Sequence, residues 1–190
     1  MNVIQLMKER RTIRKFKDEE IPDSNLYEFI DCARLAPSGA NMQPLKYVVV
    51  KSREMLDKVF ECTAWAGYLK GKGTPGEGER PKAYIAILAD TDIKKSGFEL
   101  DAGAAAMSII LAAQEMGIAS CWLGALNREK LYDILSLERK YSIVSLIALG
   151  YPAEKSVAED YTGDVKYYKD EAGMLHVPKR PLSEIIIHDV

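Results

Sequence analysis

Residues that could do chemistry gather first in a basic segment near the start of the chain. Its polar members fall within one short stretch: Arg10, Arg11, Thr12 and Arg14. The planar fork of an arginine matches the oxygens of a phosphate, so the segment could bind an anionic group. Solvated surface charges are the alternative explanation of such a stretch. A second cationic pair, Lys179 and Arg180, stands near the other end of the chain.

Familiar catalytic motifs are absent from the sequence. It contains no GxGxxG after an expected strand, no GxxxxGK[ST], no HExxH and no GxSxG. Both histidines, His176 and His188, lie near the end of the chain with no nucleophile beside them. Cys32, Cys62 and Cys121 have no histidines at metal-site spacing, so neither a metal site nor a disulfide framework is indicated. An enzyme with this sequence would depend on a cofactor for its chemistry.

Composition narrows the class of protein. The 190 residues suffice for one compact domain, and 47% apolar with 28% charged residues is typical of a folded protein. A net charge of -2 gives no general attraction to nucleic acid or to an anionic membrane. The N-terminus lacks the apolar stretch of a secretory signal, and the apolar run 102–113 is shorter than the roughly 20 residues that cross a bilayer. We therefore expect a cytoplasmic protein with reduced cysteines and no nucleic-acid or membrane partner.

Apolar periodicity and turn residues divide the chain into helices and strands. Helices are expected over 2–9, from the Asp23–Ser24 capping signal to a stop before Pro37, from Ser52 through Phe60, over 99–116 ending at Gly117, and after Asn127. Strands are expected over 47–50, 83–89, 119–123 and 143–149. This alternation predicts a sheet covered by helices. Glycines and a proline over 71–79 indicate a mobile surface loop, and the pattern weakens over 155–177.

Several of these segments, taken together, resemble the FMN-dependent nitroreductases. The stretch from Arg10 to Phe16 is similar to that family's N-terminal basic pattern, and Pro37-Ser38-Gly39-Ala40-Asn41-Met42-Gln43-Pro44 to its Pro-Ser-x-x-Asn-x-Gln-Pro loop. The segment 117–124 resembles the family's strand beside the flavin, 148–152 its final core strand, and 179–182 its terminal phosphate-binding element. The matches run in order over nearly the whole chain.

The resemblance implies an α+β fold in which a mainly antiparallel central sheet is flanked by helices, in an intertwined homodimer with FMN at the interface. It implies one nitroreductase-like domain over 1–190, with a variable insertion near 153–177 and a C-terminal docking tail over 178–190. The sequence adds two independent hints. The small-residue helix 99–116 suits close packing across a dimer axis, with a core position within one subunit as the alternative. The apolar tail needs a surface to cover, on this subunit or on a partner.

The resemblance also assigns FMN-binding roles to individual residues. The FMN phosphate would be bound by Arg10, Thr12, Lys179 and Arg180, with a contribution from the backbone or the side chain of Arg11. Arg14 would lie at the pyrimidine side of the flavin ring, where its charge stabilises the reduced flavin. The ring or ribityl chain would be contacted by Pro37, Ser38, Gly39, Asn41 and Gln43, from the other subunit. Leu123 and Gly124 would present a backbone amide to flavin N5, and Trp122 would either flank the ring or belong to the core.

The function implied is transfer of hydride from NAD(P)H, through flavin N5, to a small acceptor such as a nitroaromatic or a quinone, by a ping-pong mechanism. No catalytic side chain is demanded, and Cys121 is interpreted as a small buried apolar residue. The segments 63–79 and the tyrosines Tyr161, Tyr167 and Tyr168 are expected to select the acceptor. Two alternatives stay open: a specialised flavoenzyme of the same fold, such as a reductive dehalogenase or a flavin-processing enzyme, and a flavin-binding protein without turnover.

Overall fold

The core of the molecule is a four-stranded antiparallel sheet in the order β1-β2-β4-β3. A computed structural model describes residues 2–188, and the strands are β1 (Leu45–Val50), β2 (Ala83–Asp90), β3 (Ala119–Leu123) and β4 (Tyr141–Gly150). β4 begins earlier than its apolar run indicates because Tyr141 pairs with Asp90 of β2. The expected α+β class with a mainly antiparallel sheet is confirmed.

Side-chain alternation along β2 shows how the sheet separates two apolar layers. Ala83, Ile85 and Ile87 face one layer, whereas Tyr84 and its alternate neighbours face the other. Every residue of β2 is buried, as expected for a central strand covered on both faces. The apolar run in the sequence therefore identified the strand that lies at the middle of the protein.

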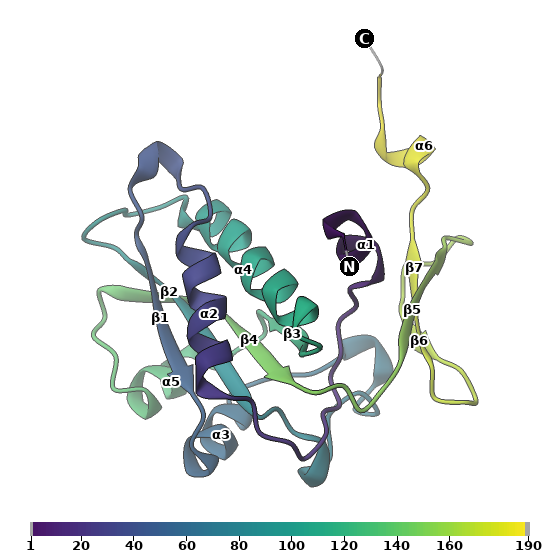
Figure 1. The fold of residues 1–190 in the computed structure, drawn as a ribbon, viewed down its shortest axis with the longest axis horizontal. Helices are drawn as coiled ribbons and strands as arrows, with labels where there is room; N and C mark the ends of the chain where they lie inside the picture. Colours follow the sequence, from purple (N-terminus) through teal and green to yellow (C-terminus); the bar gives the residue numbers. More distant parts are fainter. Residues whose placement is uncertain (1, 189–190) are drawn as a thin grey trace.

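Helices cover both faces of this sheet (Figure 1). α2 (Asp23–Arg34) and α4 (Phe98–Glu115) pack side by side on one face. α3 (Arg53–Phe60) and α5 (Arg128–Ile134) pack on the other, and α1 (Val3–Glu9) lies against α4. The alanines of α4 are buried against β2 and β4, and they allow the helix to approach the sheet closely.

Helix ends agree with the sequence signals except at α2. Asn127 caps α5 by accepting a hydrogen bond from the Lys130 amide at 3.2 Å, and Gly117 follows α4 with a left-handed φ of 72°. The prediction that Asp23–Ser24 would cap α2 is wrong, because the helix starts at Asp23 itself and has no side-chain cap. The Asp23 carboxylate instead pairs with Lys51.

A second, small sheet occupies the region where the sequence pattern weakens. It consists of β5 (Ser156–Asp160), β6 (Tyr168–Lys169) and β7 (Leu175–Lys179) in the order β5-β7-β6. β5 and β7 are parallel, and β6 and β7 antiparallel. These strands carry little apolar periodicity because they stand at the side of the main body (Figure 1).

The C-terminal segment continues from β7 through the short helix α6 (Leu182–Ile185) and projects away from the main body (Figure 1). Leu182 and Ile185 are exposed, and Ile187 is 84% exposed. The apolar tail is therefore not buried against its own chain over residues 182–188. Residues 189 and 190 of the expected tail lie outside the described range. The loop over 71–79 is largely exposed as expected, but it ends in a short 3-10 turn, Glu77–Glu79.

Replacing Gly150 with alanine should destabilise the fold. The added Cβ would stand 2.7 Å from Cδ1 and 2.8 Å from Cβ of Phe16, a fully buried residue that cannot move aside. Overpacking of this kind costs about 1–3 kcal/mol. Urea denaturation should show this loss for G150A. The control G67A has no neighbour within 4 Å of the new Cβ and should stay close to the wild type. Equal stability of G150A and the wild type would contradict the close approach.

Candidate functional site

The basic segment runs along the free edge of β3. Thr12 pairs with Ser120 as a parallel bridge, and the Ile13 amide donates a hydrogen bond of 3.0 Å to the Ser120 carbonyl. Ile13 is buried, so the backbone cannot easily leave this edge. The fold thus brings together two elements singled out in the sequence, the basic segment and the strand 119–123.

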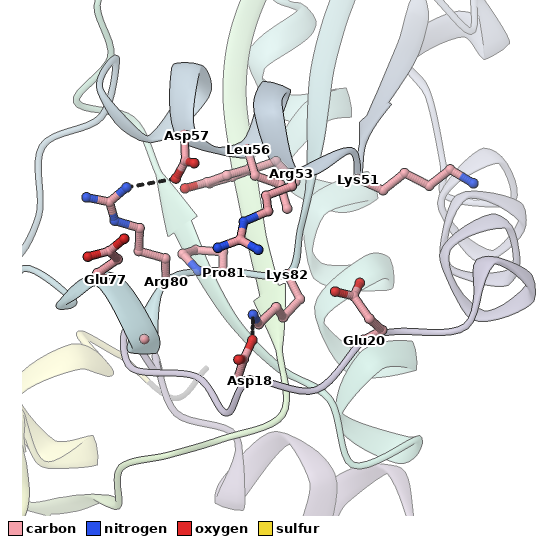
Figure 2. A pocket seen from close by; sticks show the side chains of 12 residues that line it. Asp18, Glu20, Lys51, Arg53, Leu56, Asp57, Glu77, Arg80, Pro81 and Lys82 are labelled. Atoms are coloured by element: carbon pink, nitrogen blue, oxygen red, sulfur yellow. Dashed lines mark hydrogen bonds and ion pairs between the residues drawn. The ribbon is translucent and has the colours of Figure 1, made fainter.

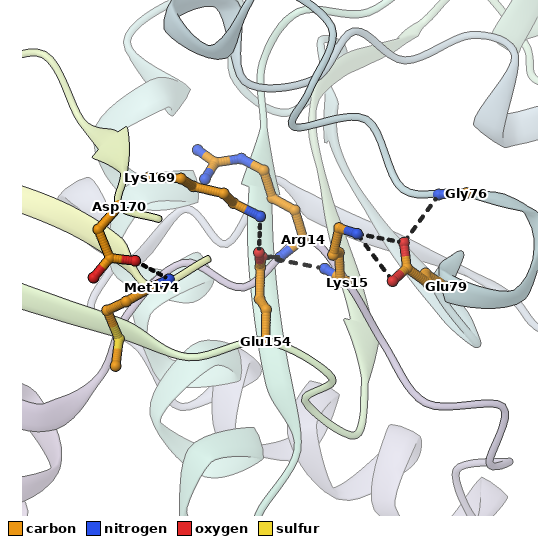
Figure 3. A network of polar contacts seen from close by, with 8 residues as sticks. All are labelled: Arg14, Lys15, Gly76, Glu79, Glu154, Lys169, Asp170 and Met174. Atoms are coloured by element: carbon orange, nitrogen blue, oxygen red, sulfur yellow. Dashed lines mark hydrogen bonds and ion pairs between the residues drawn. The ribbon is translucent and has the colours of Figure 1, made fainter. Parts of the chain in front are cut away.

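Two carboxylates fix the path of this segment (Figure 3). One oxygen of Glu154 accepts from the backbone amides of Arg14 and Lys15 at 2.7 and 3.3 Å, and its other oxygen pairs with Lys169 at 2.8 Å. Lys15 itself pairs with Glu79 at 2.7 Å. The Glu154 side chain is only 6% exposed, so its contacts are largely shielded from solvent, whereas the pair of Lys15 and Glu79 is partly exposed. It orients the backbone and leaves the Arg14 side chain free for other contacts.

The Arg14 guanidinium stacks on the ring of Tyr167, which in turn contacts Tyr68. Its carbon is 4.9 Å from the centre of the Tyr167 ring, and Tyr68 is 5.0 Å from Tyr167, centre to centre. The Arg14 Nε is buried and has no hydrogen-bond partner among the described residues. The two segments expected to select the acceptor, 63–79 and the tyrosine-bearing stretch, therefore meet at Tyr167, the ring that stacks on Arg14.

Cys121 lies beside Arg14 and is a buried thiol. Burial raises its pKa to about 11, although the nearby charge of Arg14 opposes the shift. The thiol is therefore protonated at neutral pH, which agrees with its interpretation as an apolar core residue rather than a redox group.

Arg10 and Arg11 have different surroundings. The Arg11 guanidinium turns back and donates to the carbonyl oxygens of Lys8, at 2.6 Å, and of Arg10. These are carbonyls at the end of α1, so Arg11 completes that helix. Its pKa is lowered by burial and by the charge of Arg10. Within residues 2–188, no carboxylate pairs with the side chain of Arg10 or of Arg14. Of the three arginines in the basic segment, these two have guanidinium groups available to an anion.

The loop over 37–43 has an unusual backbone. Ala40, Asn41 and Gln43 have φ values of 51°, 54° and 50°, in the left-handed region that non-glycine residues seldom adopt. Residues 39–43 are exposed, whereas the Ser38 hydroxyl points inward and donates to Asp101 at 3.2 Å. The single proton of Ser38 is therefore already used within the chain.

The remaining expected positions on β3 differ in exposure. Trp122 is 44% exposed and lies next to α4, where a Cβ on Gly103 would stand 3.9 Å from its ring. Leu123 is buried in the core, and Gly124 is exposed just after the strand. Trp122 thus lies at the surface, and Leu123 places the following backbone at the same edge.

Lys179 and Arg180 follow the small sheet. Lys179 ends β7 and is exposed, whereas Arg180 pairs with Glu184 at 2.7 Å and stacks on Tyr161 at 4.7 Å. Among the described residues, no hydrogen bond, ion pair or ring contact joins this pair, or the loop 37–43, to the basic segment. In a single chain the expected site residues therefore form three separate groups.

Sequence reasoning missed the two carboxylates that fix these groups, Glu154 and Asp101. Glu154 follows the last core strand in a segment without any pattern, so nothing in the sequence marks it. Asp101 did carry a signal, since it is an acid next to the buried Ala102 in a helix made mostly of small apolar residues. An acid on the inward face of such a helix needs partners there.

A cavity lies away from these groups, between α3 and the start of β2 (Figure 2). It measures about 220 Å³ and is lined by residues that include Arg53, Asp57, Arg80 and Tyr84. Its charges are balanced in pairs, such as Arg80 with Asp57 at 2.8 Å. None of the residues expected to bind FMN lines this cavity, although Glu77 and Gly78 of the segment 63–79 do. Its balanced charge gives no preference for a phosphate.

A histidine ties the small sheet together. Nδ1 of His176 lies 2.8 Å from Glu159 and Nε2 lies 3.2 Å from Asp170, while the ring stacks on Tyr168 at 4.9 Å. The hydrogen bonds to the two carboxylates raise the pKa of His176. Since His176 belongs to β7, this cluster fixes the strand that leads to Lys179.

Residues 2–188 contain neither a membrane-spanning helix nor a cluster of metal ligands. No helix there combines the length and apolar character needed to cross a membrane. In the same range, no group of three or more His, Cys, Asp or Glu side chains is arranged to hold a metal ion.

Comparisons with known proteins point to one family. The model of the nitroreductase family matches residues 7–151. A protein of Archaeoglobus fulgidus, provisionally named an NADH dehydrogenase/NAD(P)H nitroreductase, is 31% identical over 88% of this chain and 94% of its own. The structure of an FMN-dependent nitroreductase from Clostridium difficile shares 27% identity, with a TM-score of 0.68 over 85% of this chain and 92% of that one. A provisionally assigned nitroreductase of Desulfovibrio desulfuricans, solved with FMN, shares the fold at a TM-score of 0.75 and 23% identity, covering 100% of this chain and 98% of that one.

The pKa of His176 should be measurably above the usual value of about 6.5. A raised folded-state pKa means that the cluster stabilises the small sheet fully below the unfolded pKa, and that this stabilisation is lost as the pH rises through the folded pKa. An NMR titration of the imidazole should show the shift, and E159Q should reduce it. E129Q is the control, because Glu129 is exposed and pairs with Arg139, away from this cluster. A His176 pKa at or below 6.5 in the wild type would contradict the cluster.

Proposed function

Because the chain belongs to the nitroreductase family, we propose that it is an FMN-dependent oxidoreductase that accepts hydride from NAD(P)H and reduces a small acceptor such as a nitroaromatic or a quinone. The observation that carries the proposal is the arrangement of Arg10 and Arg14 on the edge of β3, without carboxylate partners in the described chain. When bound, FMN supplies the atom that takes up and gives away hydride, so no protein acid or base is required.

The donor set fits the cofactor. Arg10 and the Thr12 hydroxyl offer a charged donor and a neutral one to a phosphate, which carries roughly -1.5 to -2 charge at neutral pH. Arg14 has a buried Nε without a partner in the described residues, and buried donors normally have one. A ligand at this edge would satisfy it. The fixed positive charge of Arg14 would also favour the reduced, more negative form of the flavin ring.

Lys179 and Arg180 would complete the phosphate site. Arg180 would exchange Glu184 for the phosphate, and this exchange costs little because a solvent-exposed ion pair contributes little to stability. Arg11 would contribute through the α1 backbone rather than by its side chain, since its guanidinium already binds carbonyl oxygens. Residues 1–190 would form a single FMN-binding domain, with 153–177 as its variable insertion.

A homodimer would unite the three groups of residues. Leu100 on α4 is 83% exposed, and the apolar tail of residues 182–187 is exposed as well. Large exposed apolar side chains of this kind mark an association surface. A second copy would cover α4, receive the tail over 178–190, and bring its own Pro37 to Gln43 loop to the Arg14 edge. The free cysteines agree with a reducing cytoplasm as the compartment.

The acceptor would be planar. Tyr68 contacts Tyr167, which stacks on Arg14, and the two tyrosines come from the two segments expected to select the acceptor. Aromatic side chains favour flat ring systems by stacking. Nitroaromatics and quinones are flat and would suit this surface. Trp122 on β3 would offer a further aromatic side chain, and the backbone of Leu123–Gly124 would lie nearest the flavin ring.

Rapid mixing with a nicotinamide tests the enzyme against a flavin-binding protein without turnover. NADH or NADPH should bleach the flavin absorbance of the anaerobic holoprotein, and a quinone or nitroaromatic added in a second mixing step should restore it. Bleaching by neither donor would exclude the proposed reaction. Restoration only by a halogenated phenol would favour a specialised reductive dehalogenase.

Arg14→Ala should weaken FMN binding about tenfold or more, because a hydrogen bond to a charged partner contributes about 1.5–3 kcal/mol. The same variant should lower the flavin reduction potential. Cys121→Ala removes a neighbouring buried side chain that takes no part in binding, and its flavin should be reduced at the wild-type rate. Dialysis equilibria and potentiometric titration check both variants. Wild-type affinity and potential in R14A would contradict the assignment.

A further inference from the structure

Asp101 is a buried carboxylate beneath the loop over 37–43. It lies near the start of α4, and its side chain is 5% exposed. It accepts hydrogen bonds from the Gly39 amide at 3.0 Å and from the Ser38 hydroxyl at 3.2 Å, and it pairs with Lys94 at 2.8 Å. A charge can be buried in this way only when hydrogen bonds and a counter-ion compensate it.

These contacts keep Asp101 ionised. Burial by itself would raise the pKa of the carboxyl, but the hydrogen bonds from Gly39, Lys94 and Ser38 outweigh it and the pKa is lowered. At neutral pH the group is therefore an acceptor only, and it determines which way the donors of the loop point.

Ser38 passes this orientation on to the rest of the loop. Its hydroxyl donates to Asp101 and accepts from the Gln43 amide at 3.0 Å. The Ser38 carbonyl accepts from the Asn41 amide at 2.8 Å, and the Gln43 side chain donates to Asn41 Oδ1 at 3.1 Å. The exposed residues of the loop are thus connected to one buried carboxylate by short hydrogen bonds.

The loop needs such an anchor because its backbone is strained. Ala40, Asn41 and Gln43 all have positive φ values, and a residue in this region costs of order 1–3 kcal/mol. Strain of this size persists only where surrounding contacts determine the conformation. Gly39 is also constrained, since a Cβ there would stand 3.2 Å from Lys94 Nζ.

We infer that Asp101 is a positioning residue: through Ser38 and Gly39 it holds the loop over 37–43 in the strained form that presents Asn41 and Gln43 outward to the flavin. The inference rests on the proposed function, because it takes the loop as a flavin-binding element. Asp101 does not itself reach the exposed side of the loop. Asp101 acts instead on the backbone conformation of the loop, which sets where Asn41 and Gln43 point.

The test compares holoprotein variants of α4. Asp101→Asn keeps the size of the side chain but removes its charge, and its NH2 group cannot accept from Ser38 or Lys94. D101N should bind FMN about tenfold or more weakly, and should change the visible circular dichroism of the bound flavin, which reports the surroundings of the ring. Hydrogen exchange of residues 38–43 should accelerate. The control Glu99→Gln, on the exposed first turn of the same helix, should leave all three unchanged.

Each outcome has a separate meaning. Wild-type protein that binds no FMN would refute the proposed function, whereas FMN-binding wild type and D101N with the same affinity, dichroism and loop exchange would refute the role of Asp101 alone. If D101N does not fold, Lys94→Met removes the ion pair and keeps the carboxylate. It should shift dichroism and exchange in the same direction by a smaller amount, and wild-type values in K94M would then overturn the inference.

Discussion

The pairing of the N-terminal basic segment with the free edge of β3 is the interaction on which the proposed site depends. A hydrogen bond from Ile13 to Ser120 and the pair of amide contacts to Glu154 place Arg14 beside Cys121. Without them, the arginines would belong to a solvated N-terminal arm. With them, Arg14 lies under Tyr167, and the segments that cover the edge meet there.

Two buried carboxylates orient the segments that form the candidate site. Glu154 fixes the backbone of the basic segment and Asp101 fixes the loop over 37–43. Glu154 pairs with Lys169 and Asp101 pairs with Lys94, so neither buried carboxylate is left without a counter-ion. This arrangement leaves the side chains of Arg10 and Arg14 unpaired with acids among the described residues and available to a phosphate.

The sequence predicted those parts of the fold that apolar pattern and special residues encode. β2 and most of α4 are runs of apolar residues, and Gly117 and Asn127 mark helix ends. These elements could therefore be located from the order of residues along the chain. The small sheet could not, because pairing between polar strands and the His176 cluster hold it together. The candidate site residues were recognisable as motifs. The left-handed backbone of the loop, the local use of Arg11 and the position of Glu154 follow from tertiary contacts that no local pattern records, whereas Asp101 carried a signal as an acid in a helix of small apolar residues.

The absorption spectrum of the purified protein, followed by identification of the released chromophore, tests the central claim most directly. The account predicts a yellow protein that releases FMN on denaturation, in a ratio of one FMN per chain. A colourless protein that also takes up no added FMN would contradict it.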